Sequence, residues 1–143
     1  MASLRTGFLI FITLPVFLTA EAKEKPRINY FAFGGVGFAG IISEGEKKFE
    51  RLRSKENALE EFLAWYKSGT SAERAYCMLA INELDCPRYH RLKTELLEKD
   101  EKFEHRSGCL FGETTLAELF SDIEKGTYRP YFVKPFTTPD SRK

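Results

Sequence analysis

The feature that most restricts the fold of this 143-residue chain is a run of seven apolar residues, 75–81, inside a segment with helical signals. Thr70 and Glu73 have the spacing of a capping box, which predicts a helix that begins there and extends to about Leu84. A helix that is apolar on most sides is usually surrounded by other elements. The run therefore predicts the central helix of a mainly α domain.

Further helices are predicted before and after this one, at 43–53, at 56–67, from Pro87 to a frayed end at 99–101 and at 116–123. In each of them the apolar residues recur with the period of a helix. Between Ser43 and Glu98 the helices are joined by short turns, for which antiparallel neighbours are the expected packing. We therefore expect a mainly α fold, a compact bundle of four to five helices in antiparallel pairs.

A minor β element of two or three strands is predicted beside the bundle. Residues 28–33 contain Ile, Tyr and Phe, which suit a strand, and shorter extended segments are predicted at 109–111 and 130–133. We expect these segments to form a small sheet at one side, which joins the two ends of the domain.

The first 22 residues have the three parts of a secretory signal peptide. Arg5 precedes an apolar stretch, Phe8 to Leu18, and Ala20-Glu21-Ala22 supplies small residues at a cleavage site. The apolar stretch is short of the ~20 residues that span a bilayer, which disfavours the alternative of a retained anchor. We predict a signal peptide at 1–22, a single helical domain at 23–134 and a loose C-terminal tail at 135–143. The protein is then exported, periplasmic or secreted, with no stable membrane anchor after cleavage.

The charges of the chain are balanced, with 22 Lys and Arg against 21 Asp and Glu and a formal net charge of +1. A balanced chain has no basic field that attracts nucleic acid or an anionic membrane. We therefore expect no nucleic-acid partner.

Three cysteines, Cys77, Cys86 and Cys109, lie in the predicted domain. Export permits a disulfide, and three thiols allow three single pairings. The favoured pairing is Cys86 with Cys109, because the chain between them is long enough to fold back along a helix. The alternative is that all three are free thiols that pack as small apolar residues.

A glycine-rich segment, Gly35 to Gly40, matches the dinucleotide-binding pattern G-x-G-x-x-G. That site also needs a second strand after the helix, ending in an acidic residue, whereas here the predicted helix at 56–67 follows. No cofactor is therefore predicted. We interpret Gly34, Gly35, Gly37 and Gly40 as structural glycines that permit a sharp turn or a close backbone approach.

No catalytic constellation or metal site is predicted. His90, His105 and Cys109 are the other residues that suggest a metal or a Cys/His nucleophile, but a structural zinc site needs four ligands. Carboxylates are many, yet a glycosidase needs two that face each other across a cleft. The alternative function is a small secreted hydrolase that uses carboxylates or the pair Cys109 and His105.

The C-terminal segment from 128 to 136 mixes aromatic residues, prolines and cations, as protein interfaces often do. Its candidate binding residues are Tyr128, Arg129, Tyr131, Phe132 and Phe136. The alternative is a closing strand whose aromatic residues cover the core.

The segment Phe33 to Glu46, together with Ser107-Gly108-Cys109, resembles a loose group of small exported bacterial proteins. The resemblance implies a bacterial origin, and it implies that the glycine segment and the Ser-Gly-Cys turn matter to the architecture. It carries no activity, ligand or catalytic residue. We therefore expect an exported non-catalytic protein with a structural or partner-binding role, whose partner is another envelope or extracellular protein.

Overall fold

The computed structural model describes residues 26–132, so the predicted signal peptide, the predicted tail and Phe136 lie outside the described residues. The described part is mainly α with a minor three-stranded sheet, which confirms the predicted fold class. The elements are β1 (Tyr30–Phe31), α1 (Glu44–Arg53), α2 (Ala58–Ser68), α3 (Ser71–Leu84), α4 (Cys86–Leu97), β2 (Lys102–Ser107), β3 (Leu110–Thr115), α5 (Leu116–Glu124) and a 3₁₀ turn, η1 (Arg129–Tyr131).

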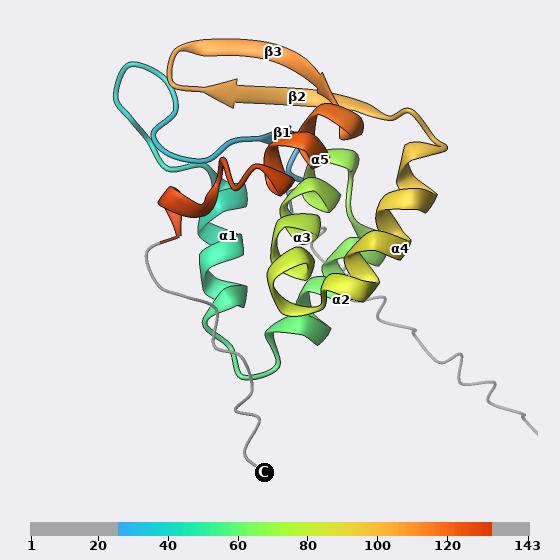
Figure 1. Cartoon of the computed structure of the whole chain (residues 1–143). Coiled ribbons are helices and arrows are strands. Elements are labelled where there is room, and N and C mark those ends of the chain that lie inside the picture. Colours follow the sequence, from blue (N-terminus) through green and yellow to red (C-terminus); the bar gives the residue numbers. More distant parts are fainter. Residues whose placement is uncertain (1–25, 133–143) are drawn as a thin grey trace, which may run out of the picture.

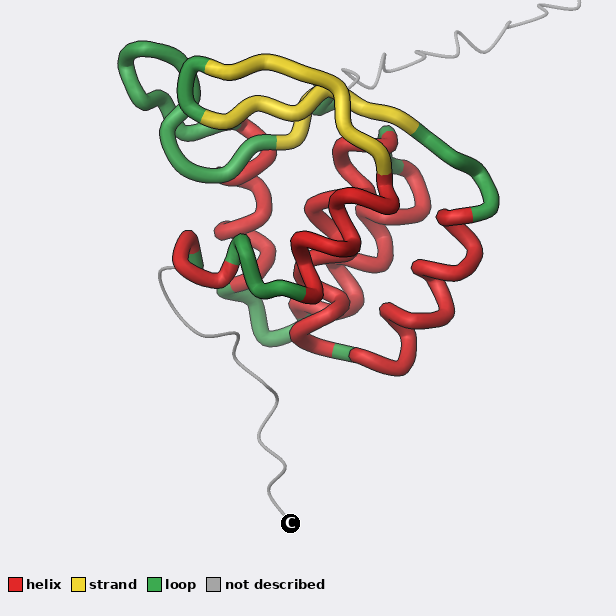
Figure 2. The backbone as a smooth tube through the Cα atoms, turned by 45° about the horizontal axis from the view of Figure 1, so that its top comes forward, coloured by secondary structure: helices red, strands yellow, loops and turns green. Residues whose placement is uncertain are grey.

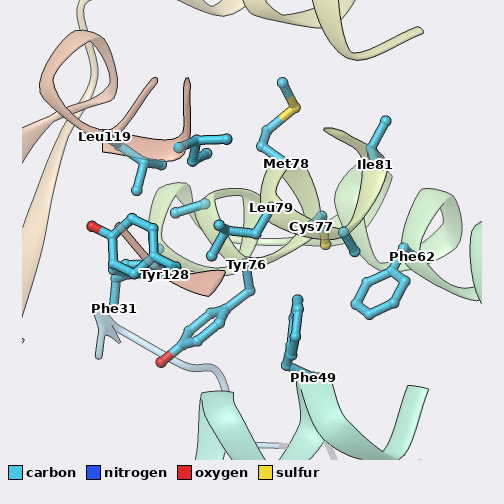
Figure 3. Packing of buried hydrophobic residues seen from close by; sticks show 14 of the residues in the cluster. Phe31, Phe49, Phe62, Tyr76, Cys77, Met78, Leu79, Ile81, Leu119 and Tyr128 are labelled. Carbon is cyan, nitrogen blue, oxygen red and sulfur yellow. The ribbon is translucent and has the colours of Figure 1, made fainter. Parts of the chain in front are cut away.

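Helix α3 is the centre of the molecule, as its apolar run predicts. Every residue from Ala75 to Ile81 is buried, and α3 lies between α1 and α4 in Figure 1. Its side chains point in several directions, toward Phe49 of α1, Phe62 of α2 and Leu119 of α5 (Figure 3). The core therefore surrounds a single helix instead of lying between two layers.

Side-chain caps fix where the helices begin. The capping box predicted for Thr70 and Glu73 is present at α3, and a second one joins Thr115 and Glu118 at the start of α5. At α1 the side chain of Ser43 accepts a hydrogen bond from the backbone N–H of Glu46. A cap of this kind typically contributes about 1 kcal/mol.

The sheet crosses one end of the helical bundle (Figures 1 and 2). Strand β2 is central: it pairs in parallel with β1, with Tyr30 opposite Glu104, and antiparallel with β3, from Lys102 opposite Thr115 to Ser107 opposite Leu110.

Two details of the predicted β element are corrected. Of the strand predicted at 130–133, the described residues 130–132 form no strand, because Arg129–Tyr131 form the 3₁₀ turn that follows Gly126, and residue 133 lies outside the described residues. The strand that replaces it in the sheet is β2, which was not predicted. The short strand predicted at 109–111 is instead the longer β3.

Candidate functional site

Exposed apolar side chains gather at one corner of the molecule. Seven large apolar side chains are exposed in the described part of the chain, and five of them lie on two segments that are distant in sequence. These five, which we call the loop–hairpin patch, are Phe38, Ile41 and Ile42 before α1 and Leu110 and Phe111 at the start of β3. Phe38 is fully exposed.

Backbone hydrogen bonds hold the two segments of the patch together. The N–H of Gly37 donates to the carbonyl of Gly108 at 2.7 Å, and Val36 forms a β-bridge with the same residue. Val36 and Ile41 exchange two backbone bonds of 2.9 and 3.0 Å, which close the loop. Figures 1 and 2 show this loop beside the turn between β2 and β3. The two segments therefore lie side by side at this corner, and Leu110 and Phe111, as neighbours on a strand, point to its opposite sides.

Glycine is needed at several positions of the loop. Gly34, Gly37 and Gly40 have positive φ angles, and a Cβ on Gly35 would lie 2.7 Å from the Cα of Gly40. These requirements arise from the path of the chain, and the segment leads into α1 and then α2 without a second strand. The dinucleotide-binding architecture is therefore absent from the described residues.

The opposite segment of the patch is the end of an edge strand. Within the described residues β3 pairs with β2 alone, and residues 110–113 are all exposed. Gly108, with φ of +56°, takes the first position of the two-residue turn, as in a type II′ hairpin. Since Ser107 and Leu110 then form the closing hydrogen-bonded pair, the backbone groups of Phe111 and Glu113 face away from β2.

Of the C-terminal candidate binding residues, some pack against the core and others are exposed. Tyr128 is buried, and the ring of Phe132 stacks on Phe49 with 5.6 Å between the centroids. Arg129 is exposed and its Nε lies 3.3 Å from the carboxylate of Glu83, while Tyr131 is also exposed. Tyr128 and Phe132, two of the four candidate residues that the structure describes, therefore pack against the core.

The three cysteines are free thiols in the structure. Cys86 is the first residue of α4, which begins at the end of the bundle away from the sheet, whereas Cys109 lies in the turn between β2 and β3 (Figure 1). The predicted pairing of Cys86 with Cys109 is therefore not formed. Cys77 is buried in the core, and burial raises the pKa of its thiol well above the ordinary value.

The Cys/His pair of the alternative function is not assembled. His105 lies in the middle of β2, with its ring 6.0 Å from that of Phe31, and burial lowers the pKa of its imidazole. Cys109 lies beyond the end of β2, roughly 10 Å further along at the rise of a strand. Residues 26–132 also contain no group of three or more His, Cys, Asp or Glu placed to hold a metal ion.

Glu46 is buried at the start of α1, and its surroundings indicate a structural role for its carboxylate. Burial raises its pKa, the neighbouring Glu50 raises it further, and a hydrogen bond from the backbone of Gly34 opposes both effects. Glu46 and Glu50 are one turn apart on the same helix, so they do not face each other across a cleft. Glu46 therefore ties the glycine loop to α1, and the two carboxylates do not form a glycosidase-like site.

Comparison with protein-family models, with curated protein sequences and with solved structures gives no match. In the described residues no helix is long and apolar enough to cross a membrane.

Proposed function

We propose that this is an exported, non-catalytic protein that binds another protein of the cell envelope or the extracellular space through the loop–hairpin patch. The observation that carries the proposal is the gathering of five exposed large apolar side chains on two hydrogen-bonded segments. Single exposed apolar side chains are ordinary, whereas a contiguous group marks an interaction site.

The edge of β3 supports a particular kind of partner. The outward backbone groups of Phe111 and Glu113 are the donors and acceptors that an added strand uses, and Leu110 and Phe111 lie directly beside them. Strand addition combines main-chain hydrogen bonds for affinity with side-chain contacts for specificity. We therefore propose that the partner presents an extended segment with apolar side chains, which pairs with β3 and covers the patch.

Site-specific photocrosslinking tests this proposal in the full chain expressed with its own N-terminal segment. A photoreactive residue is placed at Phe38, at Phe111 or, as the matched control, at Leu97, an exposed apolar residue of α4 outside the patch. We expect one protein to be crosslinked at positions 38 and 111 and not at 97. Equal capture at all three positions would contradict a dedicated surface, and capture of a second copy of this chain alone would replace the partner by self-association.

Substitutions provide a second readout of the same surface. Phe38→Ser and Phe111→Ser are expected to lower recovery of the crosslinked partner by about tenfold each, which corresponds to ~1.4 kcal/mol of binding. Leu97→Ser should leave the recovery unchanged. All three side chains are exposed, so the thermal unfolding of the variants should match that of the parent protein.

Export is tested separately by the intact mass of the protein recovered from its own cells. Cleavage of the proposed signal peptide gives a mass that begins at Lys23. A mass that still includes residues 1–22 would contradict cleavage without bearing on the patch.

A further inference from the structure

A groove that shares no residue with the loop–hairpin patch lies beside it, since the guanidinium of Arg106, which lines the groove, is 5.2 Å from the ring centre of Phe111. Its volume is about 1140 Å³, and it is bounded by residues 26–30, by α1 and α2 and by one side of β2. It is an open groove of a size that holds several residues of an extended ligand.

The groove concentrates positive charge. Its lining contains six cationic side chains and three carboxylates, although the whole chain has a net charge of only +1. The cations are Arg27, Lys47, Lys48, Arg51, Lys55 and Arg106, and the carboxylates are Glu44, Glu61 and Glu104.

The three carboxylates are already engaged by cations of the groove. Glu44 lies 2.7 Å from Lys47, Glu61 lies 2.6 Å from Lys55, and Glu104 lies 2.6 Å from Arg106. The lining still has a positive excess because three cations remain, although one of them, Lys48, lies 3.9 Å from the carboxylate of Glu73. Among these, Arg51 projects from an exposed position of α1 and forms no ion pair with a described residue.

The floor of the groove is apolar and aromatic. Trp65 and Leu52 are nearly buried there, and Ile28 and Ala64 complete the apolar lining. The Nζ of Lys48 lies 4.0 Å from the centre of the Trp65 ring, which places a cation over the indole. A ligand that fills this groove needs apolar groups for the floor as well as negative charges for the rim.

We propose that this groove binds an acidic peptide segment that also carries apolar side chains. Carboxylates of the peptide would meet Arg51, and its apolar side chains would cover Ile28 and Ala64, the more exposed part of the apolar lining. A phosphate polymer fits less well, because it has no apolar groups for the floor and its closely spaced charges would meet three carboxylates. The argument for this groove does not rest on the proposed function of the patch, although Arg106 of the groove lies over the ring of Phe111.

Trp65 is the single tryptophan of the chain and lines the groove, so its fluorescence can report the binding of a ligand there. The full-chain protein is titrated with a labelled peptide of alternating Glu and Leu, and both Trp fluorescence and peptide anisotropy are followed. We expect saturable binding that weakens with added salt, because charges at the rim are screened. A peptide with Gln in place of Glu should bind at least about tenfold more weakly.

Matched charge reversals locate the site. Arg51→Glu should weaken peptide binding by about tenfold, whereas Arg91→Glu, an equal change of net charge on an exposed position of α4 outside the groove, should have little effect. Phe38→Ser should also have no effect, which separates this site from the patch.

Several outcomes would overturn the proposal. These are the absence of an anisotropy change at millimolar peptide, equal binding of the Gln peptide, and equal weakening by Arg51→Glu and Arg91→Glu. A competing ligand, inorganic polyphosphate, is tested in the same way. If polyphosphate binds more tightly than the Glu–Leu peptide, and Arg51→Glu weakens polyphosphate binding as much as peptide binding, the groove is a phosphate site instead.

Discussion

A Cβ atom on Gly45 would lie 2.3 Å from Cε2 of Tyr76, so α1 and α3 meet at a point where only a hydrogen atom fits. The Tyr76 ring has little freedom to move away. Its hydroxyl accepts from the Ala32 N–H at 2.8 Å, donates to the Ala32 carbonyl at 2.7 Å and lies 3.1 Å from the Ser43 hydroxyl. This contact therefore fixes the spacing between the first helix and the central one.

Gly45→Ala should destabilise the protein, although Ala is normally favoured over Gly within a helix by about 1 kcal/mol. The added methyl group overlaps the Tyr76 ring, and overpacking of this kind typically costs about 1–3 kcal/mol. Urea unfolding measures the change. Gly112→Ala is the control, because nothing lies within 4 Å of the position that its Cβ would take, and its stability should be unchanged or slightly higher. A more stable Gly45→Ala variant would show that the two helices are not in tight contact.

Two buried tyrosines should respond in opposite ways to loss of the hydroxyl. Tyr76→Phe leaves the buried N–H of Ala32 without its acceptor, while the Ala32 carbonyl keeps the bond from the Ser43 hydroxyl, and the change should cost about 1–3 kcal/mol. Tyr89→Phe should be neutral or stabilising, because the Tyr89 hydroxyl is buried and has no hydrogen-bond partner within the described part of the chain. Equilibrium unfolding of the two variants side by side tests this difference, and equal losses would refute the role assigned to the Tyr76 hydroxyl.

The stability of the protein should fall at alkaline pH. Burial raises the pKa of Tyr76 from 10.0 to about 12, opposed by the hydrogen bonds from Ser43 and Ala32, and burial also raises the pKa values of Tyr89 and Tyr128. A raised folded pKa means that the unfolded chain loses its proton first, so the contribution is complete below pH 10 and is lost as the pH rises through about 12.

Urea unfolding at a series of pH values, with tyrosinate absorbance as a second signal, measures this loss. The slope of stability against pH above 10 should be smaller in Tyr76→Phe than in the parent protein. An identical slope would mean that Tyr76 is ionised in the folded protein as readily as in the unfolded chain.

The three thiols should differ in reactivity. Cys86 and Cys109 are exposed, whereas Cys77 is buried and its raised pKa keeps it protonated. A thiol-trapping reagent applied to the native protein without reductant should label two cysteines quickly, and the third only after unfolding. Intact mass spectrometry counts the labels. Fast labelling of all three would show that the centre of α3 opens readily.

The sequence predicts the helices well, because their signals are local. The cap at Thr70 and the apolar run in α3 depend on residues that are neighbours along the chain. The hairpin of β2 and β3 is harder to predict for the opposite reason. Phe103 is the single buried residue of β2, and β3 contains none, so the alternation that identifies a strand is almost absent.

The loop–hairpin patch is not predictable from the sequence. Phe38, Ile41 and Ile42 continue the apolar period of α1 toward the N-terminus, and by that pattern they belong to a buried helical face. The structure places them before the helix and exposes them, since the positive φ angles of Gly37 and Gly40 turn the chain outward. The two segments are brought side by side by a backbone hydrogen bond between Gly37 and Gly108, which are far apart in the chain.

The parallel pairing of β1 with β2 has a consequence for the order of assembly. Tyr30 has no strand partner until Glu104 is in place, whereas β2 and β3 are joined by a two-residue turn and pair locally. Contacts that close a long stretch of chain form slowly. During synthesis from the N-terminus, β1 therefore stays unpaired while the four helices α1 to α4 are made. The sheet of the domain is complete only when almost the whole domain has been synthesised.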